Sequence, residues 1–140
     1  MIVSLAQRTT NFTINQSSVE YRTPATVKPK VLELSIIQVT ATAQSLGLGR
    51  PGAIGVTPVN VLFQNDDPGD PASTINGSLS WATSPTSPTI YHRRWNSAAT
   101  AGVGIVWTFP RGLLIPVSSS LVLQNITAAV ASDVNCVMDE

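Results

Sequence analysis

The sequence is poor in charged, imidazole and thiol side chains. Eight Lys and Arg and eight Asp and Glu make up only 11% of its 140 residues, and it has one histidine and one cysteine. An ordinary soluble domain is roughly 25% charged. Acid–base or nucleophilic catalysis needs a nucleophile, a base and an orienting group that converge in space. This chain has little material for such a site, so we expect a protein with no enzymatic activity and no cofactor.

The sequence also lacks the features of disulfide-bonded, membrane-spanning and secreted proteins. A single cysteine cannot form an internal disulfide, and no apolar run reaches the roughly 18 residues of a transmembrane helix. The first residues lack the basic and then apolar segments of a secretory signal, so we expect no signal peptide. The formal net charge is zero, which gives no general attraction to nucleic acid or to an anionic membrane.

The few charges are unevenly distributed along the chain. Residues 1–65 carry five basic and two acidic side chains, a net charge of +3, and residues 66–140 carry three basic and six acidic ones, a net charge of −3. Such a division would let neighbouring subunits attract each other. In a set this small it also arises by chance.

The chain does contain segments in which every second residue is apolar. These segments are separated by turns rich in Gly, Pro, Ser and Asn. Val103, Ile105, Trp107 and Phe109 give the clearest alternation, and Pro58 places its own strand at an edge or bulge. About eight strands of this kind are typical of an all-β, antiparallel β-sandwich, jelly-roll-like in character. The expected strands lie within 30–43, 54–63, 75–81, 90–95, 103–109, 113–115, 121–126 and 133–138.

The first thirty residues differ from the rest. They are polar, contain Pro24 and Pro29, and have only scattered apolar residues. We interpret residues 1–30 as an extended N-terminal arm with at most one short strand, near Ile2–Leu5 or Phe12–Ile14, and residues 31–140 as the sandwich domain. Such arms are often ordered only on a partner.

Two polar clusters have more than one interpretation. Asp66, Asp67 and Asp70 could supply part of a calcium shell, although Asp-Pro and Pro-Gly-Asp are also ordinary turn sequences. Arg93 and Arg94, beside Trp95, could bind nucleic acid or pair with a partner's carboxylates. We favour the structural interpretation of both clusters and expect no metal site.

The large aromatic and the lone reactive residues have structural interpretations. Trp81, Trp107 and Phe109 are the expected core anchors, and Trp95 is the tryptophan most suited to an interface. Cys136 alternates with Val134 and Met138 and is expected to be a buried, inert thiol. His92 is expected to be a partly exposed strand residue whose basicity Arg94 lowers.

The C-terminal part of the chain carries a resemblance. The run Ile105–Thr127, IVWTFPRGLLIPVSSSLVLQNIT, ends a strand in Phe-Pro, turns at a glycine, and continues through a Leu-Ile-Pro step and a Ser-rich bend into a Leu-Val-Leu strand. With VNCVMDE at 134–140 it resembles the C-terminal part of small virion proteins of tailed bacteriophages. The region Trp81–Trp95 is similar more loosely. Jelly-roll capsid cement (decoration) proteins, which form trimers on the shell, have the same organisation.

This resemblance implies a non-enzymatic structural protein on the capsid surface. It would be synthesised in the host cytoplasm, form a homotrimer and stabilise the phage head by binding major capsid protein, with neither nucleic acid nor membrane as a partner. The expected subunit or capsid contacts are Arg22, Lys28, Lys30, Arg93, Arg94, Trp95 and Arg111. Two alternatives remain: a receptor- or glycan-binding module of a tail or fibre, with Tyr91 and Trp95 stacking on sugars, and a neck or tail-completion protein.

Overall fold

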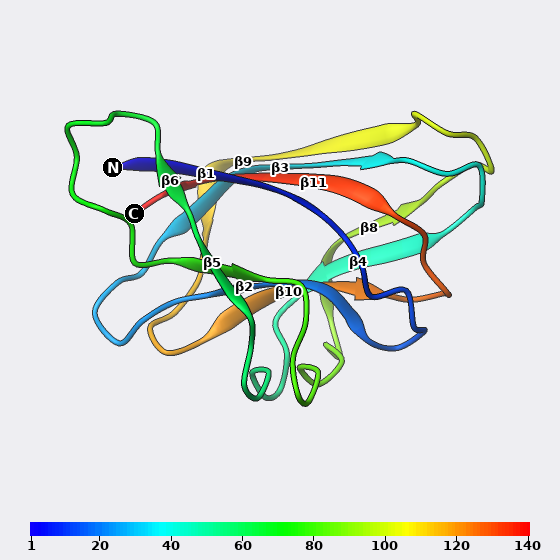
Figure 1. Ribbon diagram of the computed structural model, residues 1–140, viewed down its shortest axis with the longest axis horizontal. Coiled ribbons are helices and arrows are strands. Elements are labelled where there is room, and N and C mark those ends of the chain that lie inside the picture. Colours follow the sequence, from blue (N-terminus) through cyan, green and yellow to red (C-terminus); the bar gives the residue numbers. More distant parts are fainter.

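The computed structural model describes all 140 residues and consists of two antiparallel sheets packed face to face (Figure 1). The five-stranded sheet has the spatial order β6 (Gln64–Asn65), β1 (Ile2–Arg8), β11 (Ser132–Asp139), β3 (Lys30–Gln38) and β9 (Gly104–Leu114). The six-stranded sheet has the order β5 (Asn60–Leu62), β7 (Asn76–Ser78), β2 (Ser17–Arg22), β10 (Ser120–Asn125), β4 (Ser45–Gly49) and β8 (Tyr91–Asn96). The predicted all-β antiparallel sandwich is confirmed. The elements are all strands, so no helix is present that could cross a membrane.

The strand order is that of a jelly roll. With β5, β6 and β7 set aside, the first strand pairs with the last, β1 with β11, and the second with the second-last, β2 with β10. The inner pairs continue the scheme, β3 with β9 and β4 with β8. This nested pairing places alternate strands in opposite sheets, which is the architecture of double-sheet jelly rolls.

The three additional strands come from the long connection between β4 and β8. β5 and β7 extend the six-stranded sheet beyond β2, and β6 extends the five-stranded sheet beyond β1. The structure therefore has eleven strands where about eight were expected. Pro58 precedes β5, which lies at the edge of its sheet. The predicted edge position of this strand is confirmed, but the strand is shorter than the expected 54–63 and begins after Pro58, which has no N–H to donate to a neighbouring strand.

The core lies between the two sheets and follows the alternation of the strands. Leu34, Ile36 and Trp107 of the five-stranded sheet face Leu121 and Leu123 of the other sheet, within a cluster of 20 buried residues. Full burial of a Leu or Ile side chain stabilises the fold by about 1.5–3 kcal/mol. The two sheets are thus held together mainly by apolar burial.

The expectation of an N-terminal arm is corrected by the pairing of its residues. β1 lies between β11 and β6, and β2 lies inside the six-stranded sheet between β7 and β10. Val3 and Leu5 of β1, and Val19 and Tyr21 of β2, point into the core. The segment looked like an arm because the residues between these four are polar. Residues 1–30 therefore belong to the sandwich and do not form a separate unit.

The chain covers the outer face of its own six-stranded sheet. In Figure 1 two loops hang below this sheet. They belong to what we call the covering layer, residues 51–59 and 79–90, whose two segments are joined by the Val56–Thr83 bridge. A Cβ on Gly49 of β4 would lie 2.7 Å from the side chain of Pro88, so this close approach requires glycine. All residues of β4 and β10 are buried as a result.

Candidate functional site: the exposed face and edges of the sandwich

The outer face of the five-stranded sheet is not covered by any part of the chain. Its strands alternate core residues with outward ones, and the outward residues form what we call the open face. Ile37 is 44% exposed and Val106 is 57% exposed, and they lie on the adjacent strands β3 and β9. The open face consists of Ser4, Ala6, Glu33, Ser35, Ile37, Val106, Thr108, Asn135 and Val137.

The open face is close to electrically neutral. Arg8 and Asp133, at one end of the sheet, form an ion pair in which Nε of Arg8 lies 2.8 Å from Oδ1 of Asp133. Its hydrogen bond to Arg8 lowers the pKa of Asp133, and the same pair raises the pKa of Arg8. At the other end Asp139 pairs with the terminal amine of Met1 at 3.0 Å. Glu33 and Lys30 of β3 are exposed, unpaired and opposite in sign, so a partner that covers this face would desolvate few charges.

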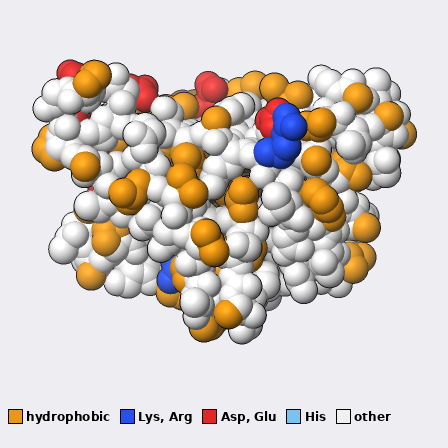
Figure 2. Space-filling model, in the orientation of Figure 1, with side chains coloured by type: hydrophobic (Ala, Val, Ile, Leu, Met, Phe, Trp, Pro, Cys, Tyr) orange, Lys and Arg blue, Asp and Glu red, His pale blue; other side chains and the backbone are white.

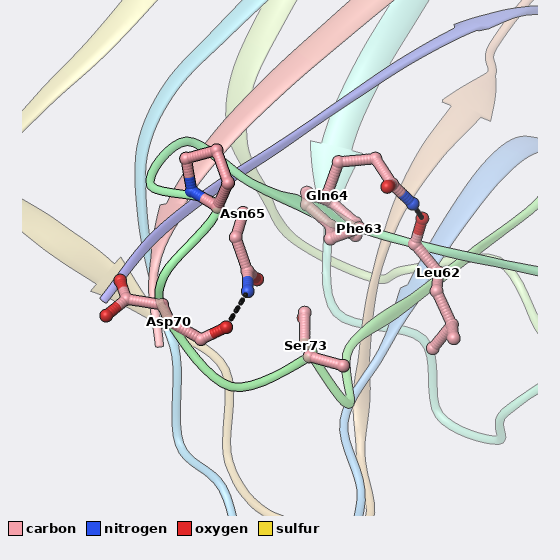
Figure 3. Close-up of a pocket in the computed structure, with 8 residues that line it drawn as sticks. Leu62, Phe63, Gln64, Asn65, Asp70 and Ser73 are labelled. Carbon is pink, nitrogen blue, oxygen red and sulfur yellow. Dashed lines mark hydrogen bonds between the residues drawn. The ribbon is translucent and has the colours of Figure 1, made fainter.

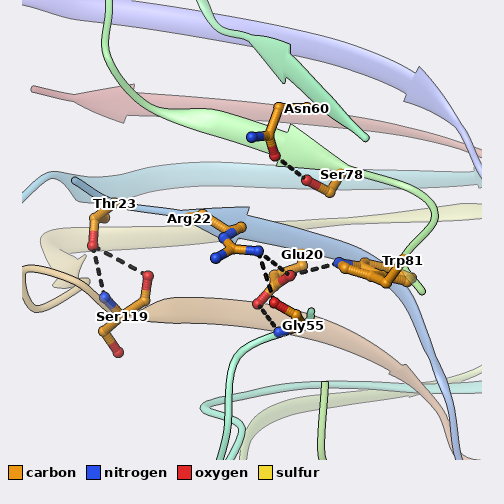
Figure 4. A network of polar contacts seen from close by, with 8 residues as sticks. All are labelled: Glu20, Arg22, Thr23, Gly55, Asn60, Ser78, Trp81 and Ser119. Atoms are coloured by element: carbon orange, nitrogen blue, oxygen red, sulfur yellow. Dashed lines mark hydrogen bonds and ion pairs between the residues drawn. The ribbon is translucent and has the colours of Figure 1, made fainter. Parts of the chain in front are cut away.

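A buried carboxylate holds the covering layer on the other sheet (Figure 4). Glu20 of β2 is 0% exposed. Its Oε2 accepts a hydrogen bond of 2.6 Å from Nε1 of Trp81, and its Oε1 accepts one of 3.1 Å from the backbone N–H of Gly55. Arg22 lies 3.8 Å from the same carboxylate and donates to the carbonyl oxygen of Gly55 at 2.9 Å. Both segments of the covering layer are therefore tied to one side chain.

Gly55 is required at this contact. A Cβ at this position would lie 2.2 Å from the Trp81 ring and 2.9 Å from Oε2 of Glu20. Any other residue would push the two segments of the covering layer apart. The arrangement gives Arg22, an expected contact residue, a partner within its own chain. Glu20 and Gly55 were missed from the sequence, and the one available signal was an acidic residue inside the Val19–Tyr21 alternation.

Arginines gather at the edge formed by β8 and β9, which we call the basic edge. Arg50 donates to the carbonyl oxygen of Leu114 at 2.7 Å, and its Nη1 lies 2.8 Å from Nε2 of His92. Burial lowers the pKa of His92, and the charges of Arg50 and Arg93 lower it further. The residue expected to have this effect, Arg94, is not among the causes. His92 is therefore a neutral acceptor that positions Arg50.

Arg93 and Arg94 face different directions because successive residues of a strand point to opposite faces of its sheet. The Arg93 guanidinium lies 5.0 Å from the centre of the Phe109 ring, and that of Arg94 lies 5.7 Å from the centre of the Tyr91 ring. Beside Arg93 is a shallow hollow of about 380 Å³, open to solvent. The hollow is lined by Arg93, Phe109, Pro110, Arg111, Gly112 and Leu113.

The three aspartates lie at the opposite edge, in the loop after β6. We call the edge formed by β5, β6 and this loop the acidic edge. Asp66 accepts a hydrogen bond of 2.8 Å from the Ser4 hydroxyl, and Asp67 accepts one of 2.8 Å from the backbone N–H of Gly69. No group of three His, Cys, Asp or Glu side chains is placed to hold a metal ion. The first of these bonds ties the loop to β1, and the second shapes its turn.

A hollow of about 460 Å³ lies inside this loop (Figure 3). Nδ2 of Asn65 donates to the carbonyl oxygens of Asp70 and Pro71 at 3.0 and 2.6 Å. The Asp70 carboxylate points away from the hollow in Figure 3, toward the outside of the molecule. The hollow is therefore shaped by the backbone of the turn, and the negative charge lies outside it.

The structure places the aromatic side chains in different environments from those expected for some of them. Trp107 and Phe109 lie in the core. Trp81 does not, contrary to expectation, because its indole N–H is used by Glu20 on the outer face of the six-stranded sheet. Trp95 packs against the core from β8, whereas Tyr91 faces outward over Gly47, where a Cβ would meet its ring at 2.5 Å. Tyr91 and Trp95 thus form no common surface for stacking on a sugar.

The remaining candidates have simple environments. Cys136 is buried beside Tyr21, and burial raises the pKa of both groups, which suits an unreactive thiol. Lys28 and Lys30 are exposed and form no ion pair within the chain.

Comparison of the chain with protein-family models, with curated proteins and with solved structures gives no match.

Proposed function

We propose that this chain is a non-enzymatic structural protein of a virus particle, a decoration (cement) protein that binds the outside of a phage head. In this proposal three copies act together, and each copy attaches to major capsid protein. Attachment stabilises the shell through buried surface, and no bond is made or broken.

The observation that carries the proposal is the contrast between the two outer sheet faces. The chain uses the 51–59 and 79–90 segments to cover one sheet and leaves the open face of the other bare. Ile37 and Val106 are exposed there among small, uncharged side chains. A nearly neutral face of this kind, with exposed apolar side chains, suits burial against another protein. The jelly-roll strand order supports the same class, because capsid domains are among the proteins that use it.

Burial of apolar surface at such a contact would supply enough free energy to hold the protein on the shell. A typical specific interface buries about 800 Å² on each partner. At roughly 25 cal/mol per Å² of apolar surface, such burial supplies on the order of 10–20 kcal/mol before the costs of association and ordering are subtracted. Many equivalent copies on one shell would add their contributions, so a modest affinity per copy can stabilise a whole particle.

The experiment that tests the proposal measures binding of the purified protein to shells that lack it. The double variant Ile37→Asp with Val106→Asp should bind at least tenfold more weakly, because two charges would be buried without partners. The matched control, Phe12→Asp with Ile14→Asp, changes two exposed apolar residues in the loop between β1 and β2 and should bind like the wild type.

Imaging of the particle supplies the second arm of the test. Density for the chain on the shell supports the proposal, whereas density confined to the neck or to a fibre overturns it. Equal binding by the Ile37/Val106 variant and the wild type also overturns it. Shells without the protein should lose integrity at lower temperature or milder osmotic shock than shells with it.

A further inference from the structure

The fold sorts the unpaired charges to opposite edges of the sandwich. The sheet orders begin with β5 and β6 at one edge and end with β8 and β9 at the other. The basic edge carries Arg93, Arg94 and Arg111, with Arg50 beside them, and none of the four forms an ion pair within the chain. Across the width of the sheets, the acidic edge carries Asp66, Asp67 and Asp70, which are also unpaired.

This separation differs from the one along the sequence. Arg93, Arg94 and Arg111 belong to the acidic half of the chain, yet they lie on the basic edge. The pairing of β8 with β4 and of β9 with β3 brings them to Arg50, which comes from the other half. The opposition of charge is therefore a property of the folded molecule, with one sign at each end of the strand order.

Figure 2 shows the side of the molecule on which β5 and β6 lie. Most of this surface is hydrophobic or uncharged, and acidic side chains gather at the upper left, where Figure 1 has the loop after β6. β5 lies in a stretch without any charge, since none occurs from Pro51 to Asn65. Natural proteins usually place charged residues on a free edge strand to prevent pairing with other chains. β5 lacks that protection.

Both edges also expose apolar side chains next to their charges. Val59, just before β5, is 65% exposed, and Ile90, just before β8, is 77% exposed. Leu62 at the end of β5 and Leu114 at the end of β9 are exposed as well. A contact between unlike edges would bury these side chains and would pair the charges around them.

We infer that the occupant of the basic edge is the acidic edge of a second copy of this chain. Like edges repel and unlike edges attract, so copies associate head to tail. A head-to-tail contact repeated by a rotation closes into a ring. The exposed carboxylates of the loop after β6 approach the arginines around the Phe109 hollow, and the complementary charges set the orientation of the contact. This inference deepens the trimer of the proposed function, on which it rests for the number of copies.

The test measures self-association of the full chain by sedimentation at low salt. Two exposed residues are reversed at each edge: Arg94→Glu with Arg111→Glu, and Asp67→Lys with Asp70→Lys. Each reversed pair should raise the dissociation constant of the assembly at least tenfold. The chain that carries all four changes should associate at least threefold more tightly than either reversed pair, because the side chains exchanged at the two edges are again opposite in sign to each other. Raising NaCl to about 0.5 M should weaken the wild-type assembly, since exposed charges are screened at that ionic strength.

Control variants separate edge contacts from general charge effects. Lys28→Glu, in the loop between the inner strands β2 and β3, and Glu33→Lys, on the open face, change the net charge by the same amount per residue and should leave the assembly unchanged. Thermal unfolding of every variant verifies that it is folded.

Several outcomes would overturn the inference. These are a wild type that stays monomeric at low salt, reversed edges that associate normally, and a folded fourfold variant that fails to assemble. Loss of assembly with the arginine changes alone, and not with the aspartate changes, would also overturn it and would assign the basic edge to another polyanion. Because the assay contains no shells, it is independent of the proposed function. Rings that do not bind shells would overturn that function and leave this inference intact.

Discussion

The two sheets of this sandwich share one core but differ in what lies on their outer faces. The difference can be seen from two glutamates, because each outer face carries one glutamate residue. Glu20 of the six-stranded sheet is fully buried and accepts hydrogen bonds from both segments of the covering layer, whereas Glu33 of the five-stranded sheet is exposed and unpaired. The chain therefore covers the outer face of one sheet by itself and leaves that of the other sheet exposed.

The comparison teaches how polar residues can be used inside a charge-poor protein. On the covered sheet, hydroxyl and amide side chains of β2 and β10 bond to each other and to the layer, as in the 3.2 Å bond from Ser17 Oγ to Gln124 Oε1 and the 2.9 Å bond from Gln124 Nε2 to Ser87 Oγ. Buried polar groups are tolerated when they are paired in this way. On the open face Asn135 also donates to the Ser35 hydroxyl at 3.0 Å, but both side chains remain partly exposed to solvent.

The largest effect is expected from removing residues 1–20, which deletes β1 and most of β2. The five-stranded sheet would lose an inner strand and the six-stranded sheet part of another, so the remaining chain should not fold cooperatively. Circular dichroism and thermal unfolding would detect this loss. A truncated chain with a sharp unfolding transition would show that the segment is an arm after all.

The next effect contrasts two neighbours on β9 that point in opposite directions. Trp107→Ala should destabilise the fold by about 3–5 kcal/mol, because it empties a large site in the core. Val106→Ala, on the open face, should change stability by no more than about 0.5 kcal/mol. Denaturant unfolding measures both, and similar values for the two variants would mean that the faces of β9 are assigned the wrong way round.

The glutamates themselves give a third test. Glu20→Gln replaces one acceptor oxygen by a donor amide that opposes Trp81 or Gly55, and should lower stability by about 1–3 kcal/mol. Glu33→Gln makes the same chemical change on the open face and should lie within about 0.5 kcal/mol of the wild type. Equal effects in chemical unfolding would contradict the distinction between a covered and an open sheet.

The smallest effect concerns pH and the Arg8–Asp133 pair. Because Arg8 lowers the pKa of Asp133, the pair favours the folded state above the ordinary carboxyl pKa of 3.8. That contribution disappears as the pH falls through the lowered pKa of the folded state. Wild type and Asp133→Asn should therefore differ slightly in unfolding midpoint at neutral pH and converge in acid. A difference that persisted at pH 2 would assign the effect to packing.

The sequence predicted those parts of the fold in which local pattern and tertiary environment agree. Val103–Phe109 and Val134–Met138 alternate between core and outside, and strands form at both places. The first of them, β9, continues to Leu114, so it also takes in the strand expected at 113–115 and the turn expected between the two. β2 was missed because its outward residues, Ser18 and Glu20, are polar yet covered by distant chain. Polarity normally indicates an exposed position, and here the partners that satisfy it are remote in sequence.

The candidate sites depend even more on contacts between residues that are far apart in the sequence. Glu20 meets Gly55 and Trp81 across sequence separations of 35 and 61 residues, which no local pattern encodes. Trp81 was assigned to the core for its size, although its N–H is what the structure uses. The arginines were recognised individually, but their gathering at one edge depends on strand order, which composition does not determine.

The nested strand order also has a consequence for folding during translation. β1 can pair with β11 only after almost the whole chain has been made, because the two strands are far apart in sequence. The hydrogen bond between Arg8 and Asp133, for example, spans 125 positions of the chain. During translation the first strands leave the ribosome long before their neighbours exist, with unsatisfied backbone donors and acceptors. Long-range pairing of this kind folds slowly. A newly made molecule therefore completes its fold only after its synthesis is finished.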